Sequence, residues 1–573
     1  MEARVYMDVD GSWVSGERRS EISWDFQECH SATGQRLKTW KLQRKDQLLY
    51  SEVDDRAEWG FLTFTSSADT EHEWGHPRVV RRGFASRGMR DNGHGRNDSD
   101  VVGRETVFAF TATLGPRTGS YGGGGSSSSA LFTIGFIQDP VARYASPQGV
   151  VDMQPLWAHH FRDWQELIGF HYSDFDEASR LAHRYSSRLA EDALASVSES
   201  YRDIVALSAR QVLGSTQFSG SPEKPLLFLK EISSNGNCQT VDVIFPAFPF
   251  FLYTNPQWLA YLLEPLLEHQ LSGQYPNKYS MHDLGAHFPN LTGHPDGRDE
   301  YMPVEECGNM LIMGLALANA LRHGHGPGAN LGPDLPGGTG HANKVGLEKA
   351  IGWLSRSRKL WDQWTGYLVR ESLIPHNQLC TDDFAGWLAN QTNLALKGII
   401  GIRAMSEISH LLGHDVESKT YGAIANEYIE KWQEYGYSRD GTHAKLAYMW
   451  EGSWTTLYNV YADSLLCFRL PSSSNQPGPK KATHITDNSQ IPLSASRGLS
   501  SRFVPDSVYQ KQSDWYPLVI QRFGLPLDSR HLYTKSDWQF FAAAVASRKT
   551  REAIIDSVAS WVNETVTGTS IVI

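Results

Sequence analysis

A polar run that is rich in turn-forming residues, residues 273–289, is the strongest candidate for chemistry in this sequence. Its ionisable and aromatic side chains are Lys278, Tyr279, His282, Asp283 and His287. A purely structural loop rarely needs so many such groups, whereas functional loops on a rigid scaffold commonly carry them. We expect Asp283 to act in acid–base catalysis, and Lys278, Tyr279 and His282 to contact a substrate. The alternative is a loop in which His282 and Asp283 only bind backbone groups.

Two adjacent glutamates, Glu305 and Glu306, follow at the start of a helix that is predicted to begin at Pro303. The helix dipole stabilises carboxylates at this position, which is the purely structural explanation for the pair. The residues that follow are apolar, however, so the helix is expected to be buried. One glutamate then points into the interior, where it can serve as a general acid or base. Asn309, one turn further on, is expected to contact the substrate.

Two further clusters lie where irregular loops enter predicted helices. One holds Asp382, Asp383 and Trp387, and the other holds Lys535 and Asp537. Helix capping is the structural alternative for the aspartates. Asp383 is a second candidate for the catalytic base, and the other four are candidates for substrate contacts. We expect both clusters to face the 273–309 segment.

These patterns predict no metal ligand and no cofactor. The short spacing of His282, Asp283 and His287 matches no strong metal motif, although the residue types can bind metals. The cysteines are far apart and include no CxxC pair, which argues against structural zinc. Cys307 has no dedicated histidine partner in the sequence, so it is expected to be a small buried residue.

The elements that would hold these groups begin with a β-rich part. Up to residue 170, short runs alternate apolar and polar residues and end at turn formers, which predicts a β-sandwich-like domain over residues 1–170. The clearest predicted strands are 4–9, 58–64, 106–113 and 130–136.

A helical part is predicted over residues 171–570. Apolar residues recur at helical spacing from residue 174 to residue 214, and again in most later segments. The later candidate helices are 256–271, 303–322, 349–369, 391–412, 416–434, 454–467, 535–546 and 550–562. Repeated helical hairpins with functional loops on one face favour an α/α barrel. Periodicity alone fits an irregular helical domain equally well.

Three stretches depart from this helical pattern. A short β insertion is predicted at about 225–250, with Asn235–Gly236 as its hairpin turn. Residues 322–345 and 471–503 have no apolar period and are expected to be flexible surface insertions.

Composition excludes several functional classes. The net charge of −11 argues against a nucleic-acid surface, which needs clustered Lys and Arg. No run of about 18 apolar residues is present, so no membrane span is expected. The first residues lack the basic and apolar regions of a signal peptide. Four sequons, at Asn97, Asn290, Asn390 and Asn563, favour export only weakly.

Five segments of the sequence together resemble the fungal secreted glutaminase A family. They are residues 228–256, 273–294, 302–313, 381–405 and 526–547, and they include the runs GQYPNKYSMHDLGAH and MPVEECGNMLIM. The resemblance covers roughly 5–321, 349–470 and 504–565, so both irregular stretches are expected to fall outside it.

The resemblance implies a β-sandwich region followed by an (α/α)6 six-hairpin barrel. It also implies hydrolysis of the amide C–N bond of L-glutamine, a small-molecule substrate, to give L-glutamate and ammonia. An extracellular or cell-wall location follows from the same resemblance. Family members usually carry a signal peptide and a further N-terminal stretch, so this chain is expected to begin inside the β region and to be truncated there.

Amide hydrolysis needs an activated nucleophile and protonation of the leaving ammonia. Water activated by a carboxylate is our hypothesis, with Glu306 or Asp383 as base and Asp283 or Glu305 as acid. Lys278 or Lys535 would hold the α-carboxylate of the substrate. A covalent route through Ser280, Thr381 or Cys307 stays open.

Two other functions fit the same residues. A glycoside hydrolase with an (α/α)6 barrel would also use paired carboxylates and Trp- and Tyr-rich loops. It would hold two inward carboxylates about 5–10 Å apart across a deep cleft. A non-catalytic glycan-binding or cell-wall protein would instead pair its acidic groups structurally beside an open aromatic groove.

Overall fold

Two antiparallel sheets form the N-terminal part of the protein in the computed structural model. The structure describes residues 3–87, 101–114, 129–231, 235–285, 287–323, 340–466, 468 and 503–565. One sheet has the order β1 (Ala3–Asp10), β9 (Val107–Leu114), β7 (Glu71–Gly75). The other has the order β10 (Phe132–Ile137), β6 (Phe61–Ser67), β3 (Arg36–Arg44), β2 (Glu21–His30), β8 (Val101–Gly103).

The two sheets share one apolar core. Trp40 of β3 and Phe64 of β6 pack with Phe108 and Phe110 of β9, and the Trp40 and Phe108 ring centroids lie 5.3 Å apart. Aromatic and β-branched residues at alternate strand positions supply this layer, which is the side-chain pattern of a sandwich. The predicted β-sandwich-like region is therefore confirmed.

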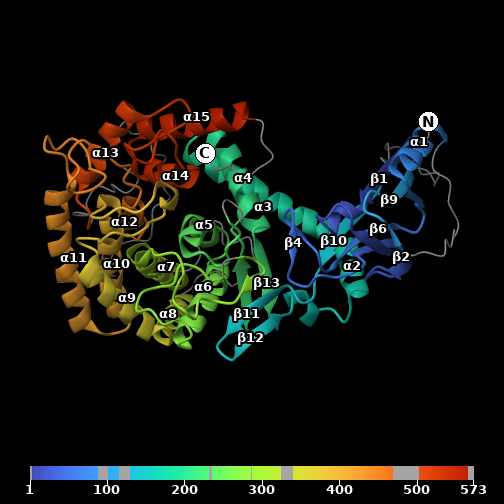
Figure 1. Ribbon diagram of the computed structural model, residues 1–573, viewed down its shortest axis with the longest axis horizontal. Helices are drawn as coiled ribbons and strands as arrows, with labels where there is room; N and C mark the ends of the chain where they lie inside the picture. Colours follow the sequence, from blue (N-terminus) through green and yellow to red (C-terminus); the bar gives the residue numbers. More distant parts are fainter. Residues whose placement is uncertain are drawn as a thin grey trace.

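A helical body makes up the rest of the chain (Figure 1). Helix α2 (Trp164–Ser173) packs on the sandwich, and α3 (Phe175–Ser196) lies between the sandwich and the body. The helices of the body are α4 (Glu199–Gly214), α5 (Val241–Thr254), α6 (Pro256–Leu271), α7 (Pro303–His323), α8 (Gly340–Arg356), α9 (Arg358–Glu371), α10 (Thr392–Leu411), α11 (Asp415–Gly436), α12 (Val460–Leu466), α13 (Asp506–Val519), α14 (Ser536–Val545) and α15 (Arg548–Glu564). The domain boundary placed at residue 170 stays a prediction.

Helices α7 and α10 lie at the centre of the body and are buried along most of their length. They approach closely because Gly308 of α7 has no side chain. A Cβ atom at Gly308 would lie 2.6 Å from Cγ of Lys397 on α10. This close packing fixes the first turn of α7 relative to Lys397.

A small third sheet joins the sandwich side to the loop that follows α6. Strand β11 (Ala142–Ser146) pairs antiparallel with β12 (Gly149–Met153) and parallel with β15 (Asn290–Leu291). The Tyr144 hydroxyl also donates to Glu268 of α6 at 2.7 Å. These contacts hold the loop between α6 and α7, which carries the candidate residues Lys278, Tyr279, His282 and Asp283.

The predicted β insertion at 225–250 is wrong in its second half. Strands β13 (Thr216–Gly220) and β14 (Pro225–Leu229) form a hairpin, but the run that begins at Val241 is helix α5. Val, Ile and Phe favour strands, and apolar periodicity does not separate a strand from a helix that is buried on most sides. Asn235–Gly236 therefore does not turn between two strands.

Other helix boundaries also differ from the predicted ones. The helix predicted at 349–369 is divided at Ser357 into α8 and α9, and α12 begins at Val460 rather than at residue 454. The stretch 322–345, predicted to be irregular, is helical from Gly340 onward in α8. Residues 324–339 and most of 471–503 lie outside the described residues. Helices α1 (Pro77–Arg87) and α13 were not predicted. Within the described ranges, no helix has both the length and the apolarity to cross a membrane.

Candidate active site

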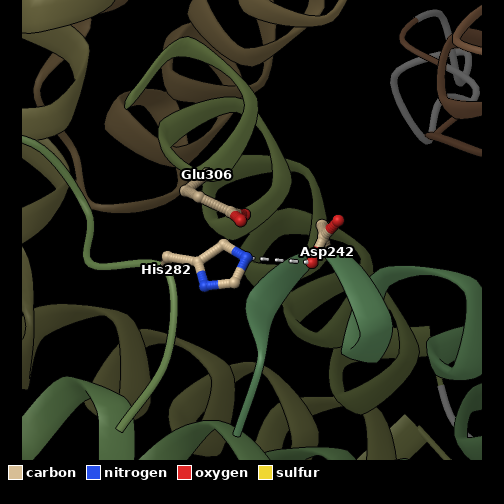
Figure 2. Close-up of side chains that lie close together, drawn as sticks. All are labelled: Asp242, His282 and Glu306. Atoms are coloured by element: carbon tan, nitrogen blue, oxygen red, sulfur yellow. Dashed lines mark ion pairs between the residues drawn. The ribbon is translucent and has the colours of Figure 1, made fainter. Parts of the chain in front are cut away.

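Three buried side chains from separate elements meet in the helical body. Asp242 lies in the first turn of α5, His282 in the loop after α6, and Glu306 in the first turn of α7 (Figure 2). Each offers one nitrogen or oxygen atom, and these atoms all lie within 4.8 Å of one another. Their exposed fractions are 6%, 3% and 0%. A nitrogen and two carboxylates at this spacing have the composition of a metal site or of a proton-transfer site.

The ring of His282 is held in one orientation by its neighbours. Its Nδ1 lies 2.7 Å from Asp283 Oδ2, and its backbone N–H donates to Asp299 at 2.8 Å. Asp283 Oδ1 is in turn bonded by His294 Nε2 at 2.7 Å and by the Gly285 N–H at 2.8 Å. Nε2 of His282 therefore faces Asp242, whose Oδ1 is 3.6 Å away.

The charges of His282 and Asp283 follow from this arrangement. Burial disfavours the charged form of His282, but the bond to Asp283 and the charges of Asp242 and Glu306 outweigh it and raise the pKa of the imidazole well above its usual range. Burial also acts against the charged form of Asp283. The bonds from His282 and His294 outweigh this and lower its pKa. Asp283 is thus an orienting carboxylate with both oxygens occupied.

A second buried group, made up of Glu305, Asn309 and Lys397, lies beside Asp242, His282 and Glu306. Lys397 Nζ is 2.7 Å from Glu305 Oε1 and donates to Asn309 Oδ1 at 2.6 Å. Asn309 Nδ2 donates to Glu306 Oε2 at 3.0 Å. Burial and the charge of Asp242 raise the pKa of Glu306 well above its usual range, and burial raises that of Glu305 despite Lys397.

The clusters from the second half of the chain reach the same place. Lys535 Nζ donates to the carbonyl oxygen of Thr381 at 3.1 Å and lies 3.9 Å from Asp383 Oδ1. Burial acts against the charged form of Lys535, but the charges of Asp537 and Asp242 outweigh it and raise its pKa. The Asp383 and Lys535 side chains are 36% and 27% exposed, which makes them the solvent-facing groups.

Asp382 is buried and Asp537 is half-buried. Burial and the charge of Asp528 raise the pKa of Asp382 to about 7, and the Tyr458 hydroxyl donates to it at 3.4 Å. Asp537 accepts from the Trp538 N–H at 2.9 Å at the start of α14, and burial raises its pKa. Asp537 therefore also has the structural role of stabilising a helix start.

The predicted aromatic contacts form a separate row. Tyr301 contacts Tyr279 on one side and stacks on the exposed Trp387 on the other, with ring centroids 5.7 Å apart in both cases. Lys278 is exposed, and among the described residues no hydrogen bond or ion pair joins it to the buried groups. Burial raises the pKa of the Cys307 thiol, which does not favour Cys307 as a nucleophile.

Sequence reasoning missed two central residues, Asp242 and Lys397. Each is a single charge inside an apolar run, Val-Asp-Val-Ile-Phe and Leu-Ala-Leu-Lys-Gly-Ile-Ile. A charged side chain on a buried element needs a partner or a functional role. A single charge inside an apolar run could therefore have identified both residues as candidates.

The fold and the candidate site define a class of protein in which a β-sandwich is joined to a helical-hairpin body. That body holds a buried cluster of carboxylates and a histidine. The helical part matches the profile described as the glutaminase A six helical-hairpin domain over residues 198–326, 342–476 and 481–571. A domain of unknown function, DUF5127, matches residues 2–192. The chain belongs to the glutaminase A family.

Two curated relatives agree with this assignment. The chain is 51% identical to a probable glutaminase of Arthroderma benhamiae, over 99% of this chain and 69% of the relative. It is 39% identical to glutaminase A of Aspergillus oryzae, over 99% of this chain and 72% of the relative. The family match includes residues 322–326, 342–345, 471–476 and 481–503, so the expectation that both irregular stretches fall outside the family pattern is wrong.

Proposed function

We propose that this protein hydrolyses L-glutamine to L-glutamate and ammonia at the cluster around Asp242, His282 and Glu306. Membership of the glutaminase A family over nearly the whole chain is the observation that carries the reaction type. The buried cluster supplies the place, because it holds ionisable groups from three elements within 4.8 Å.

The reaction adds the oxygen of water to the side-chain amide carbon and breaks the C–N bond. The nitrogen leaves as ammonia after it takes a proton that water has released. Water activation belongs to the Asp242–His282–Glu306 group, since Asp242 Oδ1 and Glu306 Oε1 are buried and have no hydrogen-bond partner. Asp283 orients His282, and Lys397 with Asn309 orients the two glutamates.

The charged ends of the amino acid need partners on the solvent side of the cluster. Lys535 is placed to bind the α-carboxylate, and Asp383, 3.9 Å from it, to bind the α-ammonium group. The pair is thus complementary to a zwitterion.

A glycoside hydrolase is the alternative function, because retaining glycosidases also use two carboxyl groups about 5 Å apart. The substrate separates the two functions.

The test is a substrate panel with the purified full chain. L-Glutamine, D-glutamine, L-asparagine and a set of aryl glycosides are incubated separately, and glutamate, aspartate, ammonia and free phenol are measured. The proposal expects equal glutamate and ammonia from L-glutamine, with Asp383→Asn raising KM for it. Turnover of a glycoside without turnover of L-glutamine, by folded protein, contradicts the proposal.

A further inference from the structure

We propose that Asp242, His282 and Glu306 bind one divalent cation of the zinc type, with one position left for water. This inference concerns binding and does not depend on which reaction the protein catalyses. It starts from the three ligand atoms that lie within 4.8 Å of one another (Figure 2).

Two oxygens in this group lack hydrogen-bond partners. Asp242 Oδ1 and Glu306 Oε1 are buried, and neither accepts a hydrogen bond. Their residues are only 6% and 0% exposed. A buried carboxylate oxygen without a donor costs free energy, and a cation bound at this point would remove that cost for both oxygens together.

The fixed cations nearby are already engaged elsewhere. Lys397 Nζ lies on Glu305 and Asn309, at 2.7 Å and 2.6 Å. Lys535 Nζ donates to the Thr381 carbonyl. Neither lysine makes an ion pair with Asp242 or Glu306 among the described residues. His282 is the ion-pair partner of Asp242, and within the same described ranges Glu306 has no ion pair.

The setting of His282 is that of a metal ligand. Histidines that bind metals almost always use their second ring nitrogen to bond a carboxylate or a carbonyl group, which fixes the ring and its tautomer. Here Nδ1 lies 2.7 Å from Asp283, and Asp283 is held in turn by His294 and the Gly285 N–H. Nε2 is left to face Asp242 and Glu306, and the partly exposed carboxylate of Glu300 lies 3.9 Å from it.

The ligand set and spacing favour zinc over calcium or magnesium. One imidazole and two carboxylates are too few oxygen ligands for calcium, and magnesium rarely takes a histidine. With zinc–ligand bonds of about 2.1 Å, tetrahedral ligands lie about 3.4 Å apart. His282 Nε2 and Asp242 Oδ1 are 3.6 Å apart. Three protein ligands with an open fourth position are the pattern of catalytic zinc sites, where the bound water is activated.

The experiment measures zinc directly. The full chain is purified, its metal content is determined by mass spectrometry, and the chelator-treated protein is titrated calorimetrically with zinc chloride, with magnesium and calcium chloride as separate arms. We expect one zinc per chain and no competition from the other two ions. Glu306→Gln and Asp242→Asn should lose the site, and Asp283→Asn should weaken it by about 10- to 100-fold.

His410→Ala is the matched control, because it removes an exposed histidine that pairs with Asp415 at 3.0 Å. The proposal is overturned if Glu306→Gln binds as much zinc as the wild type and this control. It is also overturned if the wild-type protein binds only a small fraction of one zinc per chain. If the ligand variants fail to fold, cobalt(II) in the wild type decides. An intense four-coordinate visible spectrum supports the site, and a purely octahedral one contradicts it. Zinc binding without glutamine turnover would sink only the proposed reaction.

Discussion

Lys397 Nζ lies 2.7 Å from Glu305 Oε1, and both side chains are almost wholly removed from water. This ion pair connects the centre of α10 with the first turn of α7. Through Asn309, which bonds both Lys397 and Glu306, the pair also holds the carboxylate that faces His282. The position of Glu306 is therefore set by a buried network rather than by the backbone alone.

Replacing Lys397 by methionine should destabilise the protein strongly. The change keeps most of the side-chain volume but leaves Glu305 buried without its cation, and breaking a buried pair in this way costs about 3–5 kcal/mol. Denaturant unfolding measures the loss. Lys431→Met is the control, since Lys431 and Glu427 form an exposed pair whose loss should change the unfolding free energy little. Equal effects of the two variants would contradict a structural role for the buried pair.

Stability should fall as pH rises through the range in which Asp382 loses its proton. Its pKa is about 7 in the folded protein, against about 3.9 for an unfolded chain. The folded state therefore holds the extra proton. The contribution to stability is full below about pH 4 and is lost by about pH 7, with an upper bound of about 4 kcal/mol. The charged and titratable groups facing this carboxyl are Asp528, Arg530, Lys535, Glu305 and Tyr458.

The measurement compares unfolding free energies of the wild type and Asp382→Asn from pH 4 to pH 8. Asparagine does not titrate, so the wild type should lose stability relative to the variant as pH rises. Parallel curves would show that Asp382 ionises normally.

Lys535→Ala should raise KM for L-glutamine by about tenfold to a hundredfold, with a smaller change in kcat. Such a change corresponds to the loss of one charge-assisted hydrogen bond to the substrate. Steady-state kinetics separate the two constants. Lys431→Ala, which removes an exposed lysine outside the site, is the control. A loss confined to kcat would place Lys535 in the chemical step and not in binding.

Gly308→Ala should destabilise the protein by about 1–3 kcal/mol, because the added methyl group would press on Lys397 at 2.6 Å and push α7 from α10. Gly352→Ala in α8 is the matched control. It has no atom within 4 Å of the new methyl group and should stabilise by up to about 1 kcal/mol. Thermal unfolding of both variants measures the difference, and the close approach of the two helices is refuted if Gly308→Ala is harmless.

The sequence predicted the parts of the site that lie in dense polar loops. His282 and Asp283 stood out for their density of ionisable groups, and Glu306 for its place before an apolar helix. Asp242 did not stand out, because its run of Val, Ile and Phe matches a strand as well as a buried helix. Its approach to His282 and Glu306 depends on three segments meeting, which no spacing in one segment can show.

Some elements of the fold could likewise be predicted from the sequence and others could not. The sandwich strands and helices such as α6, α7, α10 and α11 follow the periodicity of their apolar residues closely. Helix α13 did not, because its apolar residues occur as the adjacent pairs Val508–Tyr509, Trp515–Tyr516 and Leu518–Val519, and Pro517 lies within it. The division of α8 from α9 at Ser357 likewise depends on packing, since the residues on both sides favour helix.

Glutamate production by Glu306→Gln shows whether glutamine hydrolysis occurs at the buried cluster. Glutamine at this position keeps the shape of the side chain and the bond from Asn309 but removes the carboxylate. We expect kcat at least about 100-fold below wild type, in protein that still folds. A folded Glu306→Gln protein that forms glutamate at the wild-type rate would show that the reaction does not depend on this cluster.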